Sequence, residues 1–272
     1  MKKPLEVGTP KESIYELTDT ETTLERYLDN LGGRKNLYQA QKNKAIFRFL
    51  KNEQFFGKKV LDAGCGVGLW TAYFLNRGAI VTSCDMREHF IEAARRYIDS
   101  TGLGNDRVTF VCCDIIDFLN FYSKEQFDFV FAKDLIEHIH DDQMFLQKVY
   151  EVTTKQGKLF ISTQNAFSLN YLIEGFIRRL KGDKRWKGWD PTHVRFYTPF
   201  NLNKKLLKAG FRPMYWYSMY HIPYKVICSV IARIIGKSIS CECPILHFLE
   251  KYGEHFPLNK TGWNLGVISR KL

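Results

Sequence analysis

The sequence predicts an α/β fold in which a mostly parallel, seven-stranded sheet is covered by helices on both faces. Short apolar stretches, typical of buried strands, alternate along the chain with longer stretches that have helical periodicity. The strands read as nearly continuous apolar runs, as expected where both faces of a parallel sheet are covered. A glycine-rich loop directly follows the first of these strands. Ligands of such sheets bind at the carboxyl ends of the strands, so this loop marks the expected site.

The elements follow one another in a regular order. Predicted strands comprise residues 58–64, 79–85, 108–114, 127–134 and 157–163, and two final strands comprise 212–220 and 262–272. Predicted helices comprise residues 35–52, 69–78, 87–102, 141–153 and 199–211, and an apolar helical segment lies between the two final strands. The regular alternation of predicted strands and helices stops after residue 163, where a long insertion begins.

Composition and charge restrict the class of protein and its partners. The chain has 272 residues and a net charge of +11, which favours acidic partners such as phosphates, nucleic acid or anionic lipid headgroups. Its seven cysteines are scattered, as expected for reduced thiols in a cytoplasm. The basic start of the chain lacks the apolar segment of a secretory signal. We therefore expect a cytoplasmic protein.

The glycine-rich loop favours S-adenosylmethionine (SAM) over other nucleotide ligands. Its glycines are Gly64, Gly66 and Gly68, and Leu69 stands where a dinucleotide-binding loop has its third glycine. The loop also lacks the Gly-Lys-Ser/Thr sequence of a phosphate-binding P-loop. Asp62 precedes it and would repel a pyrophosphate but suits the positive charges of SAM. The loop residues expected to contact SAM are Gly64, Cys65, Gly66 and Gly68.

Acidic residues end the next two strands. Asp85 follows the second strand, where a carboxylate can accept hydrogen bonds from both ribose hydroxyls. Asp114 follows the third strand and could bind the exocyclic amine of adenine, while Met86 and Ile115 would lie on either side of the purine. Together with Asp62 and the glycine loop, these acids predict a SAM site.

The pattern resembles the class I SAM-dependent methyltransferases, and most closely the ubiquinone-biosynthesis O-methyltransferases. The resemblance rests on "FGKKVLDAGCGVG", "CDM", "DLIEHI", "FISTQN" and "DPTHVRFYTP", and its continuous part covers residues 58–165. It implies a Rossmann-like fold with a helical insertion or lid. It also implies that Lys44 binds the carboxylate of SAM and that Ala132 and Lys133 present their backbone to the methionine part.

Four parts of the chain are expected on this basis. An N-terminal arm comprises residues 1–34, and the SAM-binding core comprises 35–165. An amphipathic basic insertion comprises residues 166–192, and the C-terminal part of the core, with its helical elaboration, comprises 193–272.

Two groups of side chains could help to remove a proton from an acceptor hydroxyl. His193 follows the fifth strand and is either a base, a substrate-orienting residue or a structural partner of Asp190. Asp134, Glu137 and His138 are spaced so that their side chains could share a cation, and the resemblance implies Mg²⁺ there. Alternatively, Glu137 caps the start of a helix and His138 contacts the substrate.

The insertion is basic and amphipathic. Residues 170–189 have an apolar helical stripe, six basic residues and two tryptophans, a combination typical of a membrane interface. The resembling enzymes carry a membrane-contacting insertion at this place, and residues 224–237 repeat the combination. The alternative is a lid over the active site. We therefore expect a small or lipophilic acceptor and peripheral contact with an anionic membrane.

Three other functions stay open at this point. A nucleic-acid methyltransferase, for example one acting on RNA, fits the net charge, but the fourth strand is not followed by an Asn/Asp-Pro-Pro-aromatic motif or a Pro-Cys nucleophile. A SAM-binding regulator without catalysis would not need His193. A sugar or glycolipid methyltransferase would also suit "DPTHVRFYTP". The sequence does not predict an oligomeric state.

Overall fold

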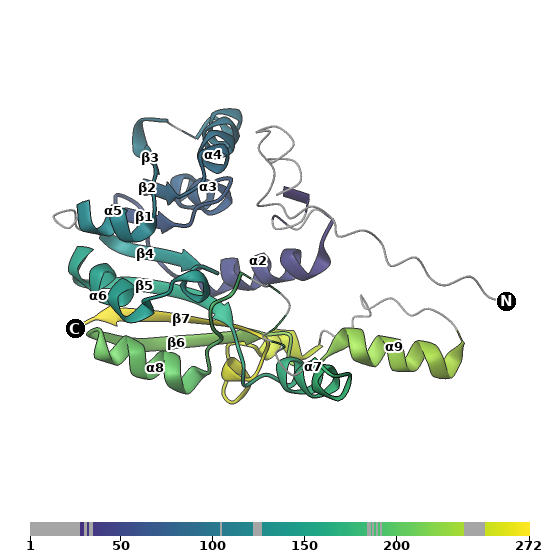
Figure 1. The fold of residues 1–272 in the computed structure, drawn as a ribbon. Helices are drawn as coiled ribbons and strands as arrows, with labels where there is room; N and C mark the ends of the chain where they lie inside the picture. The colour runs from purple at the N-terminus through teal and green to yellow at the C-terminus, as the bar shows by residue number, and fades with distance from the viewer. Residues whose placement is uncertain are drawn as a thin grey trace.

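The protein folds around one seven-stranded sheet. A computed structural model describes residues 28–29, 32, 35–103, 105–121, 127–183, 186, 188, 190, 192–236 and 248–272. The strands are β1 (Lys59–Ala63), β2 (Ile80–Asp85), β3 (Val108–Cys112), β4 (Phe127–Lys133), β5 (Thr153–Gln164), β6 (Phe211–Met219) and β7 (Asn264–Lys271). Their order is β3-β2-β1-β4-β5-β7-β6, which Figure 1 shows from top to bottom.

The first five strands are parallel, and the last two complete the sheet in the antiparallel sense. β1 pairs with β2 on one side and with β4 on the other, so the strand order reverses beside β1. β7 lies between β5 and β6 and is antiparallel to both. The carboxyl ends of β1 to β5 therefore meet at one edge of the sheet, with a point of reversal in the middle.

Helices cover both faces of the sheet. They are α2 (Leu37–Phe49), α3 (Leu69–Asn76), α4 (Glu88–Thr101), α5 (Ile115–Phe121), α6 (Asp142–Val152), α7 (Leu169–Leu180), α8 (Pro199–Lys208) and α9 (Tyr224–Ile235). Buried residues of α5, α6 and α8 pack on one face of the sheet, and those of α2, α3 and α4 pack on the other. Neighbouring residues of a strand serve opposite faces: Phe129 and Phe131 face α3, while Val130 faces α6.

The structure confirms the predicted fold class. Each predicted strand and helix is present, with boundaries shifted by a few residues. Two features were not predicted: the short helix α5, and an irregular start of β5, where pairing with β4 shifts between Phe127 and Phe129. None of the helices in the described part of the chain is long and apolar enough to cross a membrane.

Some predicted parts fall on residues that the structure does not describe. Of the N-terminal arm, only residues 28, 29 and 32 are described. In the basic insertion, Lys184, Arg185, Lys187, Trp189 and Pro191 lie outside the described residues. The described part of the insertion consists of residues 166–168, α7 and the remaining residues up to Thr192.

Candidate functional site

The glycine loop lies at the carboxyl end of β1, where the strand order reverses. Gly64, Gly66 and Gly68 have φ angles of 73°, 53° and 81°, which side chains rarely allow. The backbone N–H groups of Gly64 and Cys65 donate to the carbonyl oxygen of Cys84, at 2.8 and 3.0 Å. These bonds hold the loop against the end of β2. The predicted loop residues therefore form a tight turn whose backbone a ligand can approach closely.

Asp85 connects the loop to the end of β2. Its Oδ2 accepts a hydrogen bond from the backbone N–H of Gly66 at 3.0 Å, and its Oδ1 accepts one from the N–H of Arg87 at 3.1 Å. Burial raises the pKa of the Asp85 carboxyl, and the two backbone N–H groups oppose this rise. The carboxylate thus fixes the loop while standing at the position predicted for the ribose.

The predicted adenine-binding residues line the neighbouring strand ends. Met86 is 66% exposed, which is unusual for a long apolar side chain and suits a surface that a planar ring covers. Ile115 is buried at the start of α5. Asp114 is exposed, and its Oδ1 caps α5 by accepting a hydrogen bond from the N–H of Ile116 at 2.7 Å. These residues fit an adenosine group.

Asp62 is buried within β1, and the hydroxyl of Thr71 donates to its Oδ2 at 2.7 Å. That hydroxyl also bonds the hydroxyl of Ser83 at 2.8 Å. Burial raises the pKa of Asp62 to about 7. Asp62 therefore joins α3, β1 and β2 beneath the glycine loop, in addition to its predicted role beside the cofactor.

Two lysines share the carboxylate of Asp134 at the end of β4. Lys42 of α2 is 3% exposed and bonds Asp134 Oδ2, and the Nζ of Lys133 lies 2.9 Å from the same oxygen. The hydroxyl of Ser162 donates to Asp134 Oδ1 at 3.1 Å. Burial opposes ionisation of Asp134, but the charges of Lys133 and Lys42 hold its pKa below the usual value. Two ammonium groups against one carboxylate leave a net positive charge, which suits the carboxylate of SAM.

Lys44, the predicted ligand of that carboxylate, is exposed on α2, while Lys42 lies two residues earlier and faces the strand ends. The assignment of Lys44 stays a prediction, and Lys42 joins it as a candidate. Ala132 is fully buried within β4, next to Lys133.

Comparisons with known proteins show the family of the chain. A family model described as a methyltransferase domain matches residues 61–161. The ubiquinone biosynthesis O-methyltransferase of Idiomarina loihiensis is 30% identical over 183 residues, which are 65% of this chain and 71% of that protein. The chain belongs to the class I SAM-dependent methyltransferases, in the family of these enzymes.

Two further relatives mark the extent of the similarity. The mitochondrial ubiquinone biosynthesis O-methyltransferase of Rattus norvegicus is 34% identical over 117 residues, which are 43% of this chain and only 34% of that protein. Magnesium protoporphyrin IX methyltransferase from Synechocystis, solved with bound SAH, matches the methyltransferase fold with a TM-score of 0.59 at 14% identity. That match covers 93% of this chain and 100% of the other.

The second part of the candidate site is a pair of histidines. His138 belongs to a 3-10 turn (Ile136–His138) after β4, and His193 belongs to the segment before α8. Their ring centroids lie 4.8 Å apart at an interplanar angle of 69°. The hydroxyl of Thr192 lies 3.3 Å from Nδ1 of His138, and Oδ2 of Asp190 lies 3.6 Å from Nε2 of His193. Residues 55 positions apart thus share one site.

Burial keeps the residues around the histidine pair in their neutral forms. His193 is 7% exposed, and burial lowers its pKa to about 4. Glu137 is fully buried, and burial followed by the charge of Asp134 raises its pKa to about 8. Among the described residues, neither carboxylate oxygen of Glu137 nor Nδ1 of His193 has a hydrogen-bond partner. Each of these buried atoms can therefore still form a hydrogen bond.

The candidate metal ligands differ from the predicted set. One ligand atom from each of Glu137, His138 and His193 lies within 4.8 Å of the others. Asp134, the third predicted ligand, is instead engaged by Lys42, Lys133 and Ser162. A carboxylate neutralised by two ammonium groups is a weak metal ligand, so the structure replaces Asp134 with His193 in this group. Helix α6 is capped by Asp141, so Glu137 is not the helix cap.

Lys42 was missed in the sequence although a signal was present. It falls on the same helical stripe as Tyr38, Ala45, Ile46 and Phe49, which the spacing places on the buried face of α2. A charged residue on such a stripe needs a buried partner, and Asp134 is that partner. Thr192 gave no comparable signal, because its contact with His138 depends on the tertiary fold.

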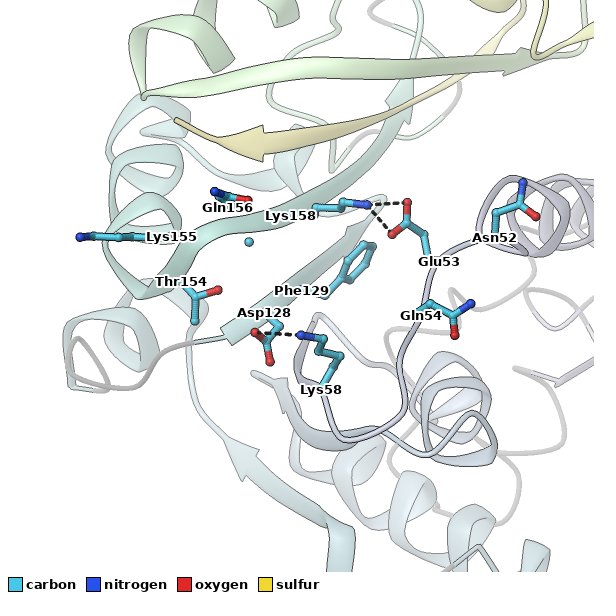
Figure 2. Close-up of a pocket in the computed structure, with 11 residues that line it drawn as sticks. Asn52, Glu53, Gln54, Lys58, Asp128, Phe129, Thr154, Lys155, Gln156 and Lys158 are labelled. Carbon is cyan, nitrogen blue, oxygen red and sulfur yellow. Dashed lines mark hydrogen bonds and ion pairs between the residues drawn. The ribbon is translucent and has the colours of Figure 1, made fainter.

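A separate cleft lies at the opposite edge of the sheet. It has a volume of about 450 Å³ and is lined by residues at the amino ends of β1, β4 and β5 (Figure 2). Four of its charged side chains form two ion pairs within the cleft: Lys158 lies 2.7 Å from Glu53, and Lys58 lies 3.8 Å from Asp128. None of the predicted site residues lines it.

Substituting Asp85 by Ala is expected to weaken SAM binding at least about tenfold, or roughly 1.4 kcal/mol. The change removes the predicted acceptor for the ribose and releases the backbone N–H of Gly66. Titration calorimetry with SAM measures the effect. Asp117→Ala, an exposed change on α5, is the control and should leave binding unchanged. Equal affinities of the two variants would contradict the assignment of Asp85.

Proposed function

We propose that the enzyme methylates a hydroxyl group of a lipophilic, phenol- or quinone-like acceptor. The observation that carries the proposal is the buried, neutral His193 with its unpartnered Nδ1, held against His138 beside the SAM loop. The names of the relatives, ubiquinone biosynthesis O-methyltransferases, support an O-directed reaction on such an acceptor.

His193 removes the proton in this reaction. When SAM is bound, it supplies an electrophilic methyl group on a sulfonium. His193 Nδ1 accepts the proton of the acceptor hydroxyl while the oxygen forms a bond to the methyl carbon and the carbon–sulfur bond breaks. Asp190, 3.6 Å from Nε2 of His193, stabilises the imidazolium that results. The proton then passes to solvent, and the site returns to its neutral form.

The donor set fits Mg²⁺ poorly. Mg²⁺ prefers oxygen ligands in octahedral geometry, whereas Glu137, His138 and His193 offer two imidazole nitrogens and one carboxylate. Imidazole ligands suit transition metals such as Zn²⁺ or Fe²⁺ better. The proposed reaction therefore uses His193 as the base, and no step of it requires Mg²⁺.

We further propose that the enzyme acts in the cytoplasm and contacts an anionic membrane through α7 and α9. On α7, Phe176 and Leu180 are 62% and 72% exposed, and Arg178 and Arg179 lie in the same last turn. On α9, Ile234 is 78% exposed next to Arg233. Figure 1 shows both helices on the side of the sheet toward which β4 and β5 point. Exposed apolar residues beside basic ones match the interfacial region of a membrane.

The inner side of α7 has a different role. Tyr171 packs against Trp186 and Phe196, with ring centroids 5.2 Å away in both cases. Phe196 in turn lies edge-on to His193, at 5.5 Å. This side of α7 covers the neighbourhood of the histidine pair, as a lid would, while the opposite side stays exposed. The lid and the membrane surface are therefore two sides of one helix.

The acceptor class is tested with SAM labelled at the methyl group, incubated with the enzyme and a cell extract. We expect the label in the lipid fraction, in a product with a new methoxy group. Label in RNA that nuclease treatment releases, or in sugars and glycolipids, would contradict the acceptor class. SAM binding without any transfer would contradict the catalytic role altogether.

Replacing His193 by Ala is expected to lower kcat about 100-fold, because the proton of the acceptor loses its base. SAM affinity should change by less than about twofold, or roughly 0.4 kcal/mol. The measurement uses a polyprenylated catechol as the acceptor and titration calorimetry for SAM. His140→Ala, an exposed histidine nearby, should retain full turnover. Turnover near normal in His193→Ala would end its role as the base.

Removal of divalent ions is expected to leave turnover unchanged, because the donor set lacks the oxygens that Mg²⁺ prefers. The enzyme is dialysed against EDTA, and turnover is compared before and after addition of Mg²⁺ or Zn²⁺. Loss of activity that Mg²⁺ alone restores would contradict this expectation. Restoration by Zn²⁺ alone would assign His193 as a metal ligand and not as the base.

The double variant Phe176→Ser, Leu180→Ser is expected to reduce binding to vesicles with anionic lipid at least about tenfold, because two exposed apolar side chains no longer enter the interface. Co-sedimentation measures the bound fraction. Phe56→Ser, which changes an exposed phenylalanine before β1 at the opposite edge of the sheet, is the matched control. Equal binding by both variants would remove α7 from the proposed surface.

A further inference from the structure

The described residues of the segment that carries His193 form no helix or strand of their own. It runs from residue 190 to the start of α8 and includes one isolated β-bridge, between Asn165 and Tyr197. The backbone N–H of Val194 donates to the carbonyl oxygen of Glu137 at 2.9 Å. Contacts of side chains must fix the rest of the segment, because a loop without such contacts adopts many conformations.

Asp142 supplies these contacts from the first residue of α6. It is 3% exposed, and its carboxylate meets three donors. Arg195 Nη1 lies 2.7 Å and the Tyr197 hydroxyl 2.7 Å from Oδ2, while Lys205 Nζ lies 2.8 Å from Oδ1. Two of the three donors belong to the His193 segment, on the same side of the carboxylate. The amino end of a helix also favours an anion at this position.

The same contacts reach the connection that carries His138. Arg195 also donates to the carbonyl oxygen of His140, and the Tyr197 hydroxyl lies 3.3 Å from the carbonyl oxygen of Ile136. Both donors therefore hold the stretch from Ile136 to Asp142 on one side and the His193 segment on the other. In this arrangement the two histidines form one unit, although they come from different parts of the chain.

We propose that Asp142 is a positioning residue that fixes His193 against His138 through Arg195 and Tyr197. The proposal rests on the function proposed above, in which His193 is the base. The predicted SAM-binding residues lie on α2 and at or near the ends of β1 to β4, and none of the described contacts of Asp142 reaches them. Its effect should therefore appear in the chemical step and not in cofactor affinity. Displacement of a reacting group by about 1 Å can cost on the order of 100-fold in rate.

Lys205 provides a matched control. It contacts the same carboxylate but belongs to α8, outside the His193 segment. Lys205→Met removes one charged partner of Asp142 and leaves Arg195 and Tyr197 in place. Asp142→Asn keeps the shape of the side chain and an oxygen for the Tyr197 hydroxyl, so the fold should persist. Arg195→Gln removes the same link between Asp142 and the segment by changing the partner that lies on the segment.

The test measures kcat for Asp142→Asn, Arg195→Gln, the double variant and Lys205→Met. Each kcat is divided by the number of SAM-binding sites from calorimetry, which excludes misfolded protein. We expect kcat to fall between about 10- and 100-fold in both single variants, with unchanged SAM affinity. The double variant should be no slower than the slower single variant, because both changes break one link. Lys205→Met should retain its turnover.

A readout independent of turnover is the NMR resonance of the His193 ring proton between the two nitrogens, assigned by its loss in His193→Ala. It should shift in Asp142→Asn and Arg195→Gln, because the edge-on contact with His138 changes. A resonance that stays in place would overturn the positioning role. A shifted resonance with full turnover would overturn the role of His193 as the base. Additive losses in the double variant, or an equal loss in Lys205→Met, would also overturn the proposal.

Discussion

The parallel pairing of β1 with its neighbours is the constraint on which the rest of the site depends. The register places Ala63 opposite Cys84 on one side and Ala132 on the other, so three strands end at one level. The residues after these ends are the glycine loop, Asp85 and Asp134. The pairing of parallel strands therefore brings three positions that are distant in the sequence to one edge of the sheet. No contact between their side chains is needed for this arrangement.

This surface has two parts that differ in the charge of their side chains. Beside β4 the charges of Lys42 and Lys133 exceed the charge of Asp134, which suits an anionic group. A few residues further along, the pKa of Glu137 rises to about 8 and that of His193 falls to about 4, so both side chains are neutral at pH 7. Charged groups beside β4 thus lie close to a buried group of neutral side chains.

The sequence contained enough information for the fold and for a prediction of the cofactor site, but not for the meeting of the two histidines. The strands and the loop are local patterns, and the acids of the predicted cofactor site lie within or close to the strand ends: Asp62 within β1, Asp85 at the end of β2 and Asp114 shortly after β3. The seven-residue helix α5 was missed because it is too short to show a helical period. The meeting of His138 with His193 depends on the path of the insertion, and the engagement of Asp134 by Lys42 depends on where α2 packs. The first leaves no local pattern, and the second is marked in the sequence only by a charged residue on the buried stripe of α2.

The position of β7 has a consequence for the order in which the protein can fold. β7 lies between β5 and β6, yet it follows β5 by about 100 residues in the chain. Until β7 has been synthesised, β5 and β6 therefore each lack a pairing strand on one edge. In a growing chain the parallel strands can pair early, but the free edge of β5 becomes paired only when β7 is present. Pairings of such long range are slow to form and leave strand edges available to other chains. During synthesis, the unpaired edge of β5 is therefore one place where this protein is exposed to aggregation.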